Sequence, residues 1–554
     1  MNKAADTDPN QETGYKTATA GNFRSRRLHF LGLDSDDIVK AFFGGNATLA
    51  IIVLLLIMFF LFKEGSGFAG QNATELVSFR QSGLEYVDLM RSQLNAFNDL
   101  PRHLSKMEAE DIKFRMKEGD ELKEAREHTK ELRDYTMELR KAVRPLDRHI
   151  KELSETSIVL RDAYKTYLNR CQEKDNLQRE ADKAARRGNT ELENRFRAEA
   201  AAVRIASIDV AARRATVTNR LPEFLAINAE LRAKLGVLLE NAPAVDREVE
   251  DEMRRFRSKA QRFIEVSLQT EDKLRSWDAE RPMPFSRRIT SFLFGRDWVT
   301  NSYFQDWYGV LPLLYGSVVV SFIALFFAVP LGIAGAVYVN QFASHSEQKF
   351  IKPYIEFISA IPSVVIGFFG VIVWGQFVRE ASGWAIFSWI PGFPISERLN
   401  AFTAGCLLAL MAIPTIFTLA EDALNNVPKA FKEASLAVGA TRLQTTIRIV
   451  IPTALSGMIS AVLLGFGRVI GETMVVLLCA GNRISIPDFS DGFSTLFQPV
   501  HTMTGIVAQE MGEVVSGSIH YRALFLVGTL LFFISLAINY MAQKIMRRYS
   551  IAEK

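Results

Sequence analysis

Six stretches of mostly apolar residues are long enough to cross a lipid bilayer as helices. They lie at Ala41–Phe62 and at about Tyr308–Val339, 352–378, 400–420, 454–480 and 521–546. About 20 apolar residues, at a rise of about 1.5 Å each, span the roughly 30 Å hydrocarbon layer of a membrane. The pattern therefore predicts an all-α, polytopic membrane bundle of six transmembrane helices. The first stretch follows a polar tail, residues 1–40, and is too long for a cleaved signal peptide, so we interpret it as a retained helix.

The residues between the first and second stretches, 63–300, are mostly polar and show a different periodicity. From Leu122 to Tyr167, mostly apolar positions recur every three or four residues, as in a coiled coil, with charged residues between them. Pro145 interrupts this stripe, so either a helix kinks there or a new helix starts with it. A turn is expected at Arg187–Asn189, and further helices are expected to about 219, at 222–240 and at 245–278. We predict an antiparallel helical bundle or a coiled-coil stalk.

Basic residues in the short loops predict the orientation. They precede the first stretch, lie between the second and third and between the fourth and fifth, and follow the sixth. If the helices alternate in direction, all of these loops lie on one side, which the positive-inside rule identifies as the cytoplasm. Both chain ends are then cytoplasmic, and residues 63–300 are extracytoplasmic.

Composition excludes several classes of function. The formal net charge is only +4 and basic residues are interleaved with acidic ones, so nucleic-acid binding is rejected. Three scattered cysteines provide neither a disulfide framework nor a metal site. The chain also lacks a phosphate-binding loop of the ATPase type and a Ser/His/Asp arrangement. We therefore expect a non-catalytic chain without a cofactor or metal site.

One predicted cytoplasmic loop, residues 422–452, carries a specific motif. Glu433 and Ala434 lie six and five residues before Gly439, and Ile449 and Pro452 lie after it. Gly439 allows a sharp turn between helices, and Pro452 suits the beginning of the next helix because it lacks an N–H group. The sequence resembles the coupling (EAA) loop of ABC importer permeases, with Ser435 and Ile451 as mild departures. That resemblance implies that the loop docks on an ATPase subunit; an ordinary amphipathic loop is the alternative.

The resemblance extends over residues 64–70 and about 290–550. Within the family, Gly467–Met474 followed by Gly481-Asn482 is similar to the PstC-type permeases of phosphate importers. It implies a permease core at 301–554 in the inner membrane of a bacterium, together with a PstA-like second permease, a PstB-like ATPase dimer and a PstS-like binding protein. It also implies contact with membrane lipid. Residues 71–290 depart from the family pattern, and the sequence assigns no role to this insertion.

Arg468 and Glu472 are charged residues within the fifth apolar stretch. A spacing of four predicts that they lie on one face of a helix. A charge inside a membrane is costly, so it usually faces the bundle interior and has a partner. Either the two neutralise each other, or Arg468 offers hydrogen-bond donors to a phosphate in the substrate pathway while Glu472 holds it in place. Both statements are compatible.

Two other functions remain open. The solute could be another oxyanion, such as sulfate or molybdate. Alternatively, two membrane helices flanking an extracytoplasmic helical bundle have the layout of a transmembrane sensor, although four further membrane helices argue against this.

Overall fold

A computed structural model describes residues 35–549 of the 554-residue chain, apart from positions 244, 246–248, 282, 283, 388, 390–392, 396 and 488. The predicted N-terminal tail up to residue 34 lies outside the described residues. The described chain is almost entirely helical, which confirms the all-α prediction, and it divides into two compact units at Leu61 and Phe62.

The first apolar stretch belongs to the long helix α1 (Ser35–Gln81). The helix continues past Phe62, so Lys63–Gly70 is helical as well. No proline interrupts residues 35–81, and the backbone hydrogen bonds can therefore continue. The chain turns into the next helix at Gly83, whose φ of +79° is the left-handed conformation that glycine adopts without strain.

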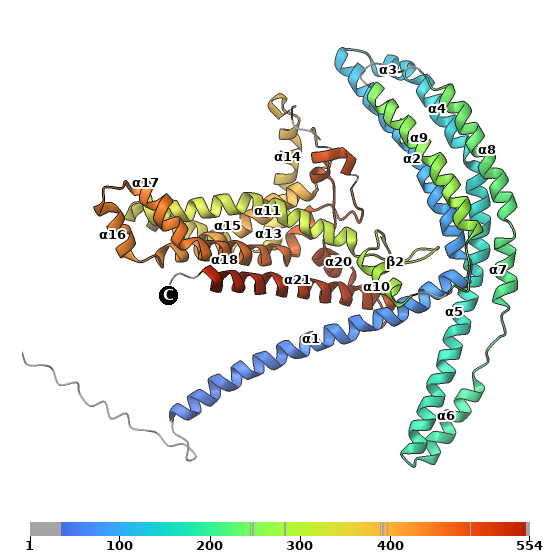
Figure 1. Ribbon diagram of the computed structural model, residues 1–554, viewed down its shortest axis with the longest axis horizontal. Coiled ribbons are helices and arrows are strands. Elements are labelled where there is room, and N and C mark those ends of the chain that lie inside the picture. The colour runs from blue at the N-terminus through green and yellow to red at the C-terminus, as the bar shows by residue number, and fades with distance from the viewer. Residues whose placement is uncertain are drawn as a thin grey trace, which may run out of the picture. The chain divides into compact units, whose positions relative to one another are not determined.

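The predicted insertion is a bundle of antiparallel helices from which a helical hairpin extends (Figure 1). The helices are α2 (Leu84–Glu118), α3 (Leu122–His128), α4 (Lys130–Ala142), α5 (Arg144–Arg186), α6 (Thr190–Ala202), α7 (Val210–Thr218), α8 (Leu221–Glu240) and α9 (Glu250–Arg275). In the bundle, α2 packs against α4, α5 and α9, and α8 packs against α4, α5 and α9. Beyond the bundle, α5 continues and pairs with α6.

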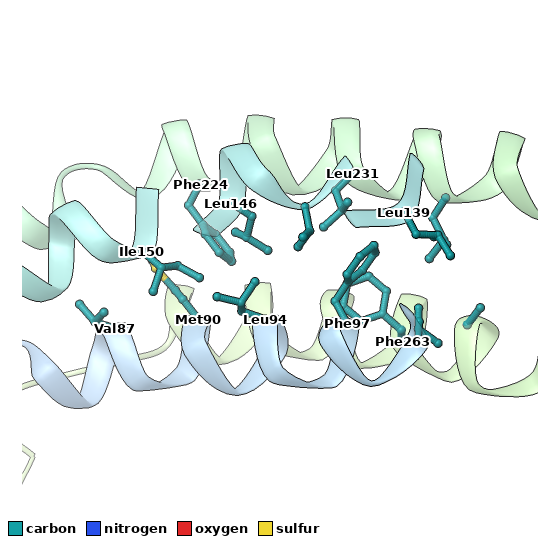
Figure 2. Packing of buried hydrophobic residues seen from close by; sticks show 14 of the residues in the cluster. Val87, Met90, Leu94, Phe97, Leu139, Leu146, Ile150, Phe224, Leu231 and Phe263 are labelled. Carbon is teal, nitrogen blue, oxygen red and sulfur yellow. The ribbon is translucent and has the colours of Figure 1, made fainter. Parts of the chain in front are cut away.

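Apolar side chains of α2, α4, α5, α8 and α9 fill the bundle core (Figure 2). Met90 and Phe97 of α2 face Leu146 of α5, and Phe224 of α8 and Phe263 of α9 close the cluster. The predicted stripe is buried at each position from Ala125 to Leu160, which confirms the periodicity. Burial of such a continuous stripe provides most of the stability of amphipathic helices.

Two of the helix boundaries predicted within the bundle are confirmed, and a third prediction is wrong. Pro145 lies in the first turn of α5, so it starts a new helix after Val143. The turn at 187–189 is present, with Gly188 at φ +72° and the Asn189 side chain capping α6. The helix expected to reach 219 instead breaks between α6 and α7, at residues 203–209.

A short connecting segment joins the bundle to the remaining membrane helices. It contains α10 (Phe285–Leu293), β1 (Trp298–Val299) and β2 (Trp307–Tyr308). The two strands pair antiparallel, with Trp298 opposite Tyr308. Neither strand was predicted, because two residues are too few to give a period-2 pattern.

The remaining chain holds the other membrane helices. In chain order the elements are α11 (Leu311–Val337), π-helical η1 (Tyr338–Phe342), α12 (His345–Ala360), α13 (Ser363–Phe369), π-helical η2 (Gly370–Trp374), α14 (Gly375–Ser382), 3-10 helix η3 (Ala385–Phe387), α15 (Ala401–Asn425), α16 (Lys429–Ala437), α17 (Arg442–Thr445), π-helical η4 (Thr446–Val450), α18 (Ile451–Ile470), α19 (Met474–Cys479), 3-10 helix η5 (Phe489–Phe497), α20 (Met503–Glu510) and α21 (Ile519–Tyr549).

Six helical stretches in the described part of the chain are long and apolar enough to cross a membrane, as predicted. They are Phe42–Gln81, Leu311–Phe342, Ser363–Ser382, Ala401–Asn425, Arg442–Ile470 and Ile519–Ile545.

Apart from the first span, whose helix continues to Gln81, two of the predicted spans have clearly different bounds. The third, expected at 352–378, is split because Ile361 before Pro362 has the extended conformation that a following proline favours. The fifth, expected at 454–480, starts earlier and ends at Ile470.

Helix α15 has the largest buried face of the membrane helices. It packs against α11 and α18, while α18 also packs against α21 (Figure 1). A Cβ atom on Gly332 of α11 or on Gly465 of α18 would lie 2.9 or 2.7 Å from the Ile416 side chain of α15. Glycine at both positions thus permits the close backbone approach that packs helices within a membrane.

Candidate functional site

The loop that contains the motif forms two short helices with a sharp turn between them. Helix α16 ends at Ala437, and Gly439 has a φ of +88°. The N–H of Gly439 donates to the carbonyl of Leu436 at 3.0 Å, and that of Ala440 donates to the carbonyl of Ser435 at 3.2 Å. This pair of bonds is the Schellman arrangement, which satisfies the last carbonyls of a helix by placing a left-handed residue after it. The turn predicted at Gly439 is confirmed.

The second helix of the loop is fixed against the first. Thr441 caps α17 by a reciprocal pair of hydrogen bonds with Gln444. The hydroxyl groups of Ser435 and Thr445 lie 2.9 Å apart and form a hydrogen bond between α16 and the second helix. The loop is therefore a defined helix–turn–helix with its own internal contacts.

One face of this loop presents apolar side chains to solvent. Leu436 is 47%, Val438 85% and Leu443 56% exposed. Glu433 and Ala434 are exposed as well. Burial of such apolar area against another surface is favourable, so this face has the properties of a docking surface.

The structure corrects the expected beginning of the fifth span. Pro452 is in the first turn of α18, but the helical backbone extends back without a gap through η4 and α17 to Arg442. The wider π-helical turn at Thr446–Val450 directly precedes the proline. Ile449 lies in that turn and is half-buried. Pro452 thus follows a π-helical turn inside the helix and does not mark its start.

Arg468 lies in the last turn of α18 and is exposed in this chain. Its Nη1 donates to Oγ1 of Thr415 on α15 at 2.8 Å. Among the residues that the structure describes, it has no carboxylate partner. A guanidinium in a membrane helix without such a partner is costly unless it faces a polar cavity or another subunit.

Glu472 is not on the same helical face as Arg468, contrary to the prediction. Helix α18 ends at Ile470, and Glu472 lies in the break before α19. Its carboxylate accepts a hydrogen bond from the N–H of Met474 at 3.2 Å, and its carbonyl accepts one from the hydroxyl of Thr504 at 2.8 Å. The two charges therefore do not neutralise each other directly in this structure. Instead, Glu472 stabilises the first turn of α19.

Two threonines of this site escaped the sequence analysis. Thr415 and Thr504 belong to α15 and α20, far from Arg468 along the chain. Thr415 follows Pro414, which interrupts an apolar stretch and was the one available signal for an unusual position. Threonine is common in membrane helices because its hydroxyl can bond to its own backbone, so the residue type alone predicts no site.

No group of three or more His, Cys, Asp or Glu side chains in the described residues could hold a metal ion.

Comparisons with known proteins concern the membrane part of the chain. The model of a family described as binding-protein-dependent transport system inner membrane component matches residues 328–548. Residues 71–290 lie outside this match.

The matches to named relatives extend over most of the length of those relatives. The probable ABC transporter permease protein YqgH of Bacillus subtilis (strain 168) is 34% identical over 242 residues, which are 43% of this chain and 72% of that protein. The phosphate transport system permease protein PstC of Pasteurella multocida (strain Pm70) is 30% identical over 268 residues, which are 47% of this chain and 79% of that protein. A solved structure of the inward-facing MetNI methionine ABC transporter is 18% identical over 44% of this chain and 94% of that chain, with a TM-score of 0.32.

Proposed function

Because this chain belongs to the family of inner membrane components of binding-protein-dependent transport systems, we propose that it is the permease subunit that conducts inorganic phosphate into the cell. In this proposal it forms the pathway together with a second, PstA-like permease. A PstB-like ATPase dimer supplies the energy, and a PstS-like extracytoplasmic protein delivers the anion.

The observation that carries the choice of phosphate is the similarity to relatives of that name. The PstC proteins of Pasteurella multocida and of Mesorhizobium japonicum are 30% and 31% identical, over 79% and 81% of their own length. The generic permease of Bacillus subtilis supports the family without specifying the solute. Phosphate is therefore the proposed substrate, and sulfate and molybdate are the competing anions in the test.

The chemistry of Arg468 supports the same choice. A guanidinium is planar and always charged, and its N–H groups match two oxygens of a phosphate. One nitrogen of Arg468 is engaged by Thr415, and the group is otherwise open to the exterior of this chain. We assign Arg468 to the wall of the pathway, where it meets the anion at the interface with the second permease. A single exposed cation binds weakly enough to release what it admits.

Glu472 has a second role in this proposal. It lies in the break between α18 and α19, where its N–H donates to the carbonyl of Val469 at 3.2 Å and no continuous helix fixes its side chain relative to Arg468. In another state of the transport cycle its carboxylate competes with phosphate for Arg468, and this competition favours release of the anion.

The loop around Gly439 transmits the movement of the ATPase. Its exposed apolar face, with Glu433 beside it, docks on that subunit, and α17 continues directly into the fifth membrane helix. A displacement of the loop would therefore reach Arg468 along one helix, α17 to α18. This proposal requires the loop on the cytoplasmic side and residues 63–300 on the opposite side.

The test is uptake of radiolabelled phosphate by cells in which this transporter is the only route. We expect uptake that depends on an intact ATPase subunit and that a large excess of sulfate or molybdate leaves unchanged. Uptake of either of these anions in place of phosphate would overturn the choice of substrate while leaving the permease assignment intact.

A further inference from the structure

The charge distribution along α9 is uneven. Lys and Arg nearly balance Asp and Glu over residues 71–290, yet the stretch Met253–Ile264 has five basic residues and no acidic one. Three of them, Arg255, Lys259 and Arg262, recur at a spacing of four and three and therefore lie on one face of the helix. A solvated helix needs no such segregation of charge.

This basic face of α9 lines a groove against α2. The groove has a volume of about 850 Å³, and Leu100 and Phe263 are among its apolar lining residues. From α2 it receives Arg102, His103 and Lys106. Cations of two neighbouring helices thus face one concave surface, which we call the α2–α9 groove.

The acidic residues of the groove compensate only some of these cations. Asp99 pairs with Arg102 at 3.2 Å, and Glu252 pairs with Arg255 at 2.7 Å. Lys259 and Arg262 are exposed and have no carboxylate partner among the residues that the structure describes. Excess positive charge in a concave surface concentrates the electric field there and attracts anionic partners.

We propose that the α2–α9 groove docks an acidic surface of the extracytoplasmic binding protein that delivers the solute. The inference rests on the proposed function, which places this bundle outside the cytoplasm. It gives the insertion a role: a second contact for the binding protein, beyond the membrane helices. The docking is electrostatic, so it mainly raises the rate of association and orients the partner.

The exposure of the cations favours a folded partner over a small anion. The side chains of Arg102, Lys106 and Arg255 are 77%, 70% and 64% exposed, so water and salt screen each of them strongly. A single phosphate would gain little from such groups, whereas a protein surface can engage several at once. The concave shape also fits a protruding protein surface better than a flat membrane.

The experiment uses the intact transporter in nanodiscs of neutral lipid, with the source organism's phosphate-binding protein loaded with phosphate. The measurement is ATP hydrolysis as a function of the concentration of that protein. The test variant is Lys259→Glu/Arg262→Glu, and Lys259→Gln/Arg262→Gln is its neutral counterpart. The matched control is Arg179→Glu/Arg186→Glu, which reverses two exposed charges on α5 that also lack a carboxylate partner among the described residues.

We expect the charge reversal to raise the half-saturating concentration of binding protein roughly tenfold without lowering the maximal rate, and the neutral variant to have a smaller effect. The difference should shrink at about 0.5 M salt, where screening extends only over a few ångströms. The control should behave as the unmodified protein. Hydrogen exchange of α9 establishes that the variants fold.

Three outcomes would overturn the inference. If the unmodified transporter responds to the binding protein and the reversal changes nothing, the groove is not a docking site, and the proposed function stands. If the reversal instead weakens binding to vesicles that contain anionic phospholipid, and leaves hydrolysis unchanged, the groove contacts lipid. If the unmodified transporter hydrolyses ATP but is not stimulated by phosphate-loaded binding protein, the phosphate assignment itself has failed, and this inference fails with it.

Discussion

Single side chains carry the proposed transport chemistry, and Arg468 is the foremost. Its charge lies within a membrane helix, is exposed at the surface of this chain and is oriented by the hydroxyl group of Thr415. The hydroxyl accepts one N–H of the guanidinium and so limits the directions of the others. Binding of an anion by a fork of donors depends on both the charge and this orientation.

The first prediction separates the effect of the Arg468 charge on uptake from the effect of the orientation of its guanidinium group. Arg468→Ala should reduce phosphate uptake roughly 10- to 100-fold, because a hydrogen bond to a charged group contributes about 1.5–3 kcal/mol. Arg468→Lys keeps the charge but loses the planar fork, so it should retain a small part of the uptake. Thr415→Val has nearly the same shape and should raise the KM for phosphate several-fold.

Uptake by cells with equal amounts of assembled complex measures these effects. Thr418→Val is the matched control, because its hydroxyl bonds to the carbonyl of Pro414 and does not contact Arg468. Undiminished uptake by the alanine variant would remove Arg468 from the pathway.

A second residue, Asp88 of α2, makes the helical bundle sensitive to pH. Burial raises the pKa of Asp88 to about 6, Arg91 opposes the rise, and Asp297 and Glu85 add to it. In an unfolded chain the pKa of an aspartate is about 3.9. The folded state therefore takes up a proton at higher pH than the unfolded state. Stability gained from this residue is complete below about pH 4 and is lost as the pH rises through about 6.

The second prediction follows from this loss of stability with rising pH. Asp88→Asn should increase hydrogen-exchange protection of the first turns of α2 at pH 7.5 by roughly fivefold, equivalent to about 1 kcal/mol after allowance for solvent screening of a partly buried group. Near pH 4 the gain should vanish. Asp99→Asn, at an exposed position of the same helix, should give no gain at either pH. Equal protection of Asp88→Asn and the unmodified protein at pH 7.5 would contradict the prediction.

At the scale of elements, the turn between α16 and α17 determines whether the loop can act as a rigid unit. Gly439 has a positive φ, and a Cβ atom there would meet no atom within 4 Å. Substitutions at this position therefore test backbone conformation without a steric clash. Proline is the most disruptive choice, because its φ is fixed near −65° and it cannot donate to the carbonyl of Leu436.

The third prediction is a graded series at this turn. Phosphate-stimulated ATP hydrolysis should fall in the order Gly439→Asn, Gly439→Ala and Gly439→Pro. Asparagine tolerates the left-handed region, other L-residues pay about 1–2 kcal/mol there, and proline cannot adopt it. Glu433→Lys should impair co-purification of the ATPase, because it reverses an exposed charge beside the apolar face. Normal stimulation in the proline variant would argue against the docking assignment.

Breaks in the helices have a different origin from that of the turn. Pro362 ends α12 through the steric restriction on the residue before it. The break at 471–473 contains no proline, and its backbone is stabilised by tertiary contacts, such as the bond from Thr504 to the carbonyl of Glu472. The first kind of break can be predicted from the sequence, and the second depends on residues far along the chain.

For the whole molecule, the orientation across the membrane is the central proposal. It requires the helical insertion and the coupling loop to lie on opposite sides. Cys171 on α5 is a natural reporter for the insertion, and Val438 is the most exposed apolar side chain of the loop.

The fourth prediction uses a membrane-impermeant maleimide. In intact spheroplasts, Cys171, or a cysteine introduced by Arg187→Cys at the exposed turn, should be labelled. Val438→Cys in a Cys171→Ser background should be labelled only after the membrane is permeabilised. The reverse pattern would invert the orientation and would remove both the ATPase docking and the binding-protein contact.

The sequence by itself determined which segments are apolar enough to enter the membrane and that the polar residues between the first two of them form a helical bundle. Long apolar runs cannot remain in water, and the stripe from Ala125 to Leu160 has one periodicity that buries it. Gly439 was also predictable, because a glycine after a short amphipathic helix marks a left-handed turn.

Only the tertiary structure decided which residues meet. It separated Arg468 from Glu472 by ending α18 at Ile470, and it joined Arg468 to Thr415 of another helix. Likewise, it brought the cations of α2 and α9 together around one groove. Local patterns report the burial and conformation of nearby residues, whereas such pairings depend on the packing of helices that are distant in the sequence.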